Sequence, residues 1–269
     1  MNEQTLTINH YTYSLWHQKN DDTNYHWLLL HGFMGSYHDF DTIIADLPGE
    51  IIALNLLGFN TTDTVTDTRR FTMSQQIIDI AAILKWYGWD DAHLLGYSMG
   101  GRLALGFALQ HPEMLRKLIL ESASPGLTAI ATQKQRRQLD QQRAATLLDD
   151  FPAFISKWEQ LPLFASQSRL PSQLKVKIRQ QRLNQNPNNM ATSLVQMGTG
   201  QQPNYWPSLA HLNVATTVIV GELDQKFRQI GSDMLALLPN ARLYCLAQAG
   251  HNCHLERPQQ FLESVLNDL

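Results

Sequence analysis

The chain has 269 residues, of which 43% are hydrophobic and 17% are charged, and its net charge is −3. This length is enough to bury one large core, and α/β folds of this size are commonly single domains with an insertion. The apolar runs fall short of the roughly 18 residues that cross a bilayer, so we expect no membrane partner. The acidic balance also argues against nucleic acid as a partner.

The first residues of the chain and its two cysteines provide evidence on the cellular compartment. Residues 1–4 lack the basic region and apolar stretch of a secretory signal, which favours a cytoplasmic location. The two cysteines, Cys245 and Cys253, do not form a disulfide framework, and we interpret them as buried thiols or bystanders.

Apolar patterns along the chain predict strands that alternate with helices. Alternation of apolar and polar residues predicts a first hairpin at 6–9 and 11–15. Runs without alternation are typical of parallel strands buried on both faces, and they follow at 27–30, 51–54, 92–95, 115–120, 218–220 and 241–246. Helical patterns lie at 43–47, 74–87, 99–110 and 258–266. This order predicts an α/β fold with a mostly parallel, eight-stranded sheet flanked by helices.

The segment 128–205 interrupts this alternation, because it contains no strand-like run and shows helical periodicity at 143–148 and 174–183. We interpret it as a helical cap inserted after the sixth strand, with 1–127 and 206–269 forming the core. Helical insertions of this kind cover active sites, exclude water and add substrate contacts.

The cap also differs from the core in charge. It holds ten basic and four acidic residues, a net charge of +6, which leaves −9 on the rest of the chain. A positive insertion on a negative core predicts an anion-binding site, although a solvated helical surface explains many of the individual charges.

The motif G-x-S-x-G around Ser98 carries the clearest chemical signal. It follows the predicted strand 92–95 and precedes a helical pattern, so a sharp turn would expose the serine hydroxyl. Asp224 follows a later strand, and His251 follows the last one after Gly250. The order Ser98, Asp224, His251 is that of the α/β-hydrolase fold, and we predict a catalytic triad. Asp224 as a helix cap, a buried Ser98 and a solvated His251 are the structural alternative.

Neighbouring residues complete this predicted site. The backbone amides of Phe33 and Met99 would form an oxyanion hole. His31 is interpreted as stabilising the turn before Phe33 rather than as a base. His254 competes with His251 for the role of base, but Gly250 favours His251. No histidine pair has convincing metal-ligand spacing, so we predict no metal site.

Arg102 lies four residues after Ser98, and therefore on the same face of the predicted helix one turn along. An arginine beside a catalytic serine suggests a substrate carboxylate, which a guanidinium binds through two parallel hydrogen bonds. A surface salt bridge is the alternative.

Motifs in core and cap together resemble a known family, from about Leu28 to Phe261. They are His31–Gly35, Gly100-Gly101-Arg102, Ser122–Leu127, Arg136 with Asp140, Trp158–Phe164, Met197–Pro203, Gly221–Phe227 and Ala249–Asn252. These motifs resemble the MenH family of 2-succinyl-6-hydroxy-2,4-cyclohexadiene-1-carboxylate synthases, α/β-hydrolase-fold enzymes of menaquinone biosynthesis.

The resemblance implies a carbon–oxygen lyase and not a hydrolase. The triad of that family removes a proton from the substrate ring, pyruvate is eliminated, and no cofactor or metal is needed. Its small substrate carries three carboxylates. By motif, Tyr97 and Arg102 would bind it from the core, and Arg136, Trp158 and Arg182 from the cap.

The chain also departs from the family. The loop after the fourth strand reads Asn55–Asn60, where Asp-Leu-Pro-Gly-His-Gly is usual, and Glu159 follows the cap tryptophan, where some members have tyrosine. Two alternatives therefore stay open: a serine hydrolase of a small carboxylate ester or a C–C bond, and a non-catalytic ligand-binding relative of the fold. The oligomeric state is not fixed by the sequence.

Overall fold

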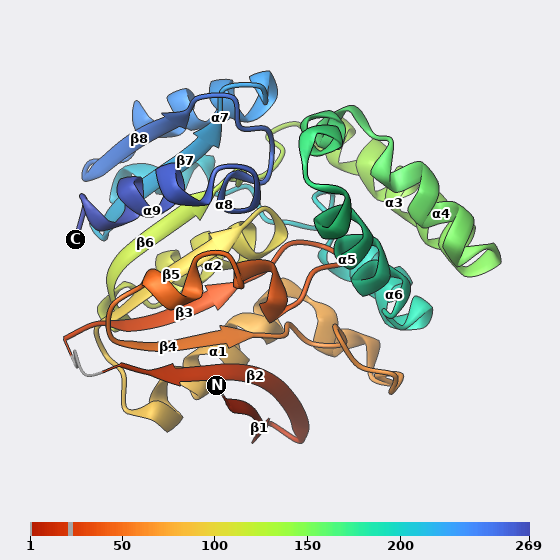
Figure 1. Ribbon diagram of the computed structural model, residues 1–269, viewed down its shortest axis with the longest axis horizontal. Coiled ribbons are helices and arrows are strands. Elements are labelled where there is room, and N and C mark those ends of the chain that lie inside the picture. The colour runs from red at the N-terminus through yellow and green to blue at the C-terminus, as the bar shows by residue number, and fades with distance from the viewer. Residues whose placement is uncertain (1, 21–23) are drawn as a thin grey trace.

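The computed structural model describes residues 2–20 and 24–269. Within them, one sheet contains eight strands in the order β1-β2-β4-β3-β5-β6-β7-β8 (Figure 1). β1 pairs antiparallel with β2, and β2 pairs antiparallel with β4, whereas the remaining pairs are parallel. The strands span Asn2–Ile8, Tyr11–Lys19, His26–Leu30, Glu50–Leu54, Ala92–Tyr97, Leu115–Glu121, Ala215–Gly221 and Ala241–Leu246, numbered β1 to β8 in chain order.

Helices cover both faces of the sheet and create two core layers. Leu28 and Leu30 of β3 belong to the larger layer, which also takes apolar side chains from α1 (Met73–Tyr87), α2 (Met99–Gln110) and α7 (Gln225–Leu235). Trp27 and Leu29 point to the other layer, beneath α8 (Cys253–Glu256) and α9 (Pro258–Leu266). This alternation explains why positions 27–30 of the strand are all apolar: both faces of the strand are buried there.

The predicted α/β fold with an eight-stranded, mostly parallel sheet is confirmed, and the strands lie where the apolar runs predict them. One predicted helix is wrong: only Ile44–Asp46 of the segment 43–47 forms a short 3-10 turn. The reason is local, because Leu47 precedes a proline and takes an extended conformation with ψ 135°, the backbone region favoured before proline.

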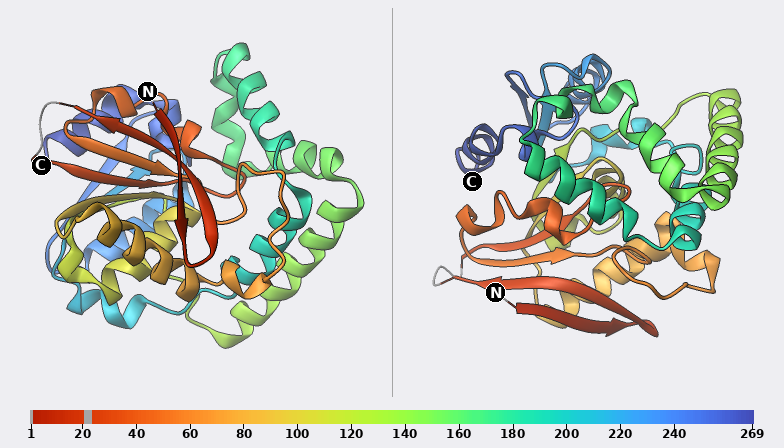
Figure 2. Two further views of the ribbon diagram at one scale, coloured as in Figure 1. Left: turned by 90° about the horizontal axis from the view of Figure 1, so that it is seen from below. Right: turned by 45° about the vertical axis from the view of Figure 1, so that its right-hand side comes forward.

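Between β6 and β7, the regular secondary structure consists of helices. It forms α3 (Ile130–Asp149), α4 (Phe151–Glu159), α5 (Ser172–Leu183) and α6 (Pro187–Met197), with 3-10 helices at Pro162–Arg169 and Trp206–His211. Figure 1 and Figure 2 show α3 to α6 gathered on one side, beyond the carboxyl ends of the central parallel strands. We keep the name cap for 128–205.

Amide side chains join the cap to the core. Asn189 of α6 is fully buried and donates to the backbone carbonyls of Gly58 and Asp63, while its own oxygen accepts from the Val65 amide. These bonds replace the water that both surfaces would otherwise bind. No helix among the described residues is both long and apolar enough to cross a membrane.

Candidate active site

Ser98 lies on a strained turn between β5 and α2. Its φ is 52° and its ψ is −104°, a conformation that non-glycine residues rarely adopt and that exposes the hydroxyl. The two motif glycines allow this turn because backbone passes directly over them. A Cβ on Gly96 would lie 2.5 Å from the Gly100 carbonyl oxygen, and one on Gly100 would collide with the Leu30 carbonyl oxygen.

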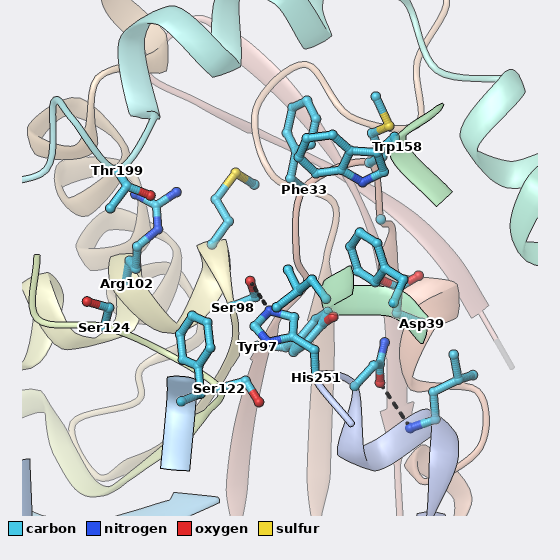
Figure 3. Close-up of a pocket in the computed structure, with 18 of the residues that line it drawn as sticks. Phe33, Asp39, Tyr97, Ser98, Arg102, Ser122, Ser124, Trp158, Thr199 and His251 are labelled. Carbon is cyan, nitrogen blue, oxygen red and sulfur yellow. Dashed lines mark hydrogen bonds between the residues drawn. The ribbon is translucent and has the colours of Figure 1, made fainter. Parts of the chain in front are cut away.

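The three residues of the predicted triad are joined by two hydrogen bonds. Ser98 Oγ is 2.9 Å from His251 Nε2, the contact drawn in Figure 3. His251 Nδ1 is 2.7 Å from Asp224 Oδ2. Asp224 and His251 are 8% and 1% exposed, so the carboxylate orients the ring where water does not compete. Asp224 also caps α7, since its Oδ1 accepts from the Phe227 amide at 3.2 Å. The helix-cap interpretation of Asp224 is therefore correct, and its other oxygen is still hydrogen-bonded to His251, so the cap does not exclude the predicted triad.

Two buried glutamates hold the loop that carries His251, and neither was predicted from the sequence. Glu256 accepts from the Gly250 amide at 2.8 Å. Glu121 accepts from the amides of Cys253 and His254 at 2.5 and 3.1 Å. For Glu121, the sequence signal was its position directly after the apolar run 115–120. A charged residue at the end of a buried strand is rarely buried without partners.

His254, the competing candidate for the base, has a different partner. Its Nδ1 lies 2.5 Å from the Glu121 carboxylate, and both side chains are fully buried. Burial lowers the pKa of His254, but the Glu121 charge and hydrogen bond outweigh it and raise the pKa above its usual value. Among the described residues, His251 is the histidine that contacts Ser98.

The predicted oxyanion donors border the same space. Met99 is the first residue of α2, and Phe33 follows Gly32, whose added Cβ would be 3.7 Å from Ser98 Cβ. Both residues line the cavity beside Ser98. Within the described chain neither backbone amide donates a hydrogen bond. Two free amides beside Ser98, one of them at a helix N-terminus, can stabilise a developing negative charge.

His31 uses both of its ring nitrogens within the fold, one of them on the turn that carries Phe33. Its Nδ1 donates to the Gly32 carbonyl at 2.7 Å, and its Nε2 accepts from the Leu56 amide at 3.0 Å. These two bonds require the neutral ring. Burial lowers the pKa of His31 and maintains that form.

A cavity of about 660 Å³ lies between cap and core and contains the hydroxyl of Ser98. All five predicted substrate-binding residues line it, namely Tyr97, Arg102, Arg136, Trp158 and Arg182. In Figure 3 the Trp158 indole lies next to Phe33, and the two ring centres are 5.3 Å apart at 64°. Trp158 therefore connects the cap directly to the turn that carries Phe33.

Arg102 differs from the other cavity arginines because no carboxylate pairs with it among the described residues. Its Nη1 donates to the Met197 carbonyl at 2.9 Å, and Thr199 lies beside its guanidinium in Figure 3. Burial, with a smaller effect from nearby Arg136, lowers the pKa of Arg102 to about 10. The interpretation of Arg102 as half of a surface salt bridge is wrong, since its guanidinium faces the cavity and has donors to spare.

Arg136 and Arg182 already have internal carboxylate partners. Arg136 Nε lies 2.9 and 3.0 Å from the two oxygens of Asp140, which is 2% exposed. Arg182 lies 3.1 Å from Glu159, whose other oxygen contacts Arg179 at 2.5 Å. Glu159 thus joins two arginines of the cap. Each arginine keeps free N–H groups for a further anion.

Lys226 also lines the cavity and was given no role from the sequence. Its Nζ lies 5.4 Å from the centre of the Phe227 ring, and that ring packs on His251 at 4.6 Å. Burial and the charge of Arg136 lower the pKa of Lys226.

Among the described residues, no cluster of three or more His, Cys, Asp or Glu side chains is arranged to hold a metal ion.

The chain is similar in sequence to proteins of one named activity. It is 38% identical, over 86% of its length and 85% of the relative, to a Bacillus subtilis (strain 168) protein provisionally named 2-succinyl-6-hydroxy-2,4-cyclohexadiene-1-carboxylate synthase. It is 32% identical to the synthase of that name from Serratia proteamaculans (strain 568), over 90% of this chain and 92% of that one.

Solved structures agree with this similarity. The structure of MenH from S. aureus matches with a TM-score of 0.90 and 36% identity, over 95% of this chain and 97% of that one. The epoxide hydrolase CorEH matches with a TM-score of 0.82 at 18% identity and so shares the fold alone. The alpha/beta hydrolase fold family matches residues 25–258. The chain belongs to this fold family and, within it, to the MenH family.

Proposed function

We propose that this protein is a 2-succinyl-6-hydroxy-2,4-cyclohexadiene-1-carboxylate synthase that eliminates pyruvate by triad-driven proton abstraction. One observation carries the proposal: the guanidinium of Arg102, which has no carboxylate partner in the described part of the chain, lies in the cavity one helical turn from a serine already in contact with His251. Family membership supports the same activity, since relatives with this name align over most of the chain.

In the proposed reaction, Ser98 and His251 act together as the base. Ser98 Oγ takes the proton from the substrate ring as its own proton passes to His251 Nε2, 2.9 Å away. Asp224 stabilises the imidazolium that forms. The electron pair of the broken C–H bond then makes a new double bond in the ring, and the carbon–oxygen bond to the enolpyruvyl group breaks. This group leaves as the enolate of pyruvate, which becomes pyruvate by gaining a proton at its methylene carbon as His251 gives up the proton that it accepted.

Negative charge develops on the substrate during this step, and the Phe33 and Met99 amides would stabilise it. Arg102, Arg136 and Arg182 would bind the substrate carboxylates, with Tyr97 and Trp158 packing against the ring. Binding one anion from core and cap at once orients the ring proton towards Ser98. The net charge of +6 on the cap supports a polyanionic substrate.

The test measures two activities on one preparation. We expect rapid pyruvate release from the enolpyruvyl substrate and feeble turnover of nitrophenyl esters without a burst, because proton abstraction leaves Ser98 unmodified. Ser98→Ala abolishes activity in a lyase and in a hydrolase alike, so it cannot separate them. Efficient ester turnover with an acyl-enzyme burst, and no pyruvate, would instead establish a serine hydrolase. Binding of the substrate without either activity would establish a non-catalytic relative.

A further inference from the structure

Gln185, in the loop between α5 and α6, binds two core loops with one side chain. It is 3% exposed. Its Nε2 donates to the Gly35 carbonyl at 3.0 Å, and its Oε1 accepts from the Asn60 amide at 2.8 Å. The amide thus uses a donor and an acceptor at once, and each core loop depends on this cap residue for a buried hydrogen bond.

Gly35 ends the turn that carries the Phe33 amide. The Gly35 amide donates to the Gly32 carbonyl at 3.1 Å. Met34 has a φ of 60° and Phe33 does not have a positive φ, which is the pattern of a type II turn. Because Met34 is not a glycine, this turn is strained and needs support from its surroundings.

The turn hydrogen bond decides where the Phe33 N–H points. In a planar trans peptide, the Gly32 carbonyl and the Phe33 N–H point in opposite directions. The carbonyl is directed into the turn, where Gly35 and His31 both donate to it. The Phe33 N–H is therefore directed out of the turn, and it donates no hydrogen bond within the described chain.

We propose that Gln185 is a positioning residue that orients the Phe33 amide from the cap. Its side chain donates to the Gly35 carbonyl, and the Gly35 amide donates to the Gly32 carbonyl. The Gly32–Phe33 peptide, whose N–H is the predicted oxyanion donor, is therefore fixed in orientation. This inference rests on the proposed function in one respect, since it gives the Phe33 amide a charge to stabilise. Asn60, part of the loop in which the chain departs from its family, anchors the Gln185 oxygen and so takes part in the same arrangement.

Gln185→Met tests the proposal, because methionine has a similar length but neither donates nor accepts a strong hydrogen bond. We expect kcat for pyruvate release to fall about tenfold, part of the loss seen when an oxyanion donor is removed. KM stays within twofold, since the cavity arginines are untouched. Gln180→Met is the matched control, in α5, the helix that precedes the loop of Gln185. That side chain is exposed, pairs with Asn184 and lies outside the cavity, so its kcat stays at the wild-type value.

A second comparison separates the oxyanion turn from cap docking in general. Asn189→Ala removes buried bonds between cap and core without touching Gly35. We expect it to lower the melting temperature and to leave kcat within about threefold. Gln185→Glu keeps an acceptor for Asn60 and a similar shape, so it replaces Gln185→Met if the latter fails to fold. An equal loss of kcat in the Asn189 and Gln185 variants would assign the effect to cap docking and overturn the proposal.

The rate at which a fluorophosphonate modifies Ser98 provides a readout independent of the physiological substrate. This reaction also develops negative charge beside the oxyanion donors, so we expect it to slow in Gln185→Met and not in Gln180→Met. A rate within twofold of wild type overturns the proposal, whatever the pyruvate assay shows. If the wild type releases no pyruvate but phosphonylation still slows in the variant, the proposed function fails and the role of Gln185 stands.

Discussion

The Ser98 amide donates a 2.8 Å hydrogen bond to the backbone carbonyl of Glu121, and the carboxylate of Glu121 accepts hydrogen bonds from the amides of Cys253 and His254. One residue at the end of β6 therefore holds both the turn that carries Ser98 and the loop that carries His251. The 2.9 Å contact between Ser98 and His251 depends on two chain segments that share this support.

Glu121→Ala is expected to lower kcat by tenfold or more, because small displacements of a reacting pair cost up to about a hundredfold in rate. KM should change little. Glu121→Gln, which retains an oxygen for the two backbone amides, should recover most of the activity. Steady-state kinetics on preparations of equal folded fraction check this. If glutamine is as damaging as alanine, the carboxylate charge matters more than the amide contacts.

Arg102→Ala should remove roughly 2–5 kcal/mol of transition-state binding if its partner is a desolvated substrate carboxylate. Arg102→Lys keeps the charge but loses the paired N–H groups, so it should recover only part of the loss. The measurement is kcat/KM, with the exposed Arg69 replaced by alanine as the control. A change smaller than about threefold would show that Arg102 does not bind the substrate.

Glu159→Gln should tighten substrate binding. The Glu159 carboxylate neutralises one of the two charges on Arg179 and Arg182, and a substrate carboxylate must share Arg182 with it. Removing that charge is expected to lower KM by roughly two- to fivefold, the size of a partly exposed ion-pair contribution. A higher KM would mean instead that Glu159 holds Arg182 in its binding orientation.

Two buried histidines should make the fold less stable in mild acid. Burial lowers the pKa of His93 to about 4 and also lowers that of His31. In the unfolded chain both rings take up protons near pH 6.5, so stability is full above that pH and is lost as the pH falls towards 4. His93 alone accounts for about 3 kcal/mol over this range. Urea unfolding between pH 4 and 7 measures the slope, and His93→Phe should flatten it; an unchanged slope would contradict this origin.

The sheet and the predicted triad could be anticipated because each depends on local patterns. An apolar run at 218–220 that is soon followed by Asp224 indicates a buried strand and a polar residue beyond its end, without reference to any other segment. Helices α4 and α6 were not predicted individually. They are 9 and 11 residues long, too short for periodicity to distinguish them within a polar cap.

The partners of the charged residues could not be read from the sequence. Glu159 meets Arg179 and Arg182 through the packing of α4 on α5, and Gln185 reaches Gly35 across 150 positions of chain. Such contacts depend on how the cap lies on the core, which residue spacing does not specify. Strain at Met34 was equally hidden, because a methionine gives no sign of a positive φ.

The two ends of the described chain lie away from the cap. β1 begins at Asn2, in the antiparallel hairpin at one edge of the sheet. α9 ends at Leu266 and packs against β7 and β8, towards the other edge. Figure 1 and Figure 2 show the cap helices on another side of the molecule. An affinity tag or a fusion partner at either end would therefore leave the cavity free. The same arrangement would let the enzyme be immobilised on a solid support through either end with its cap facing the solution.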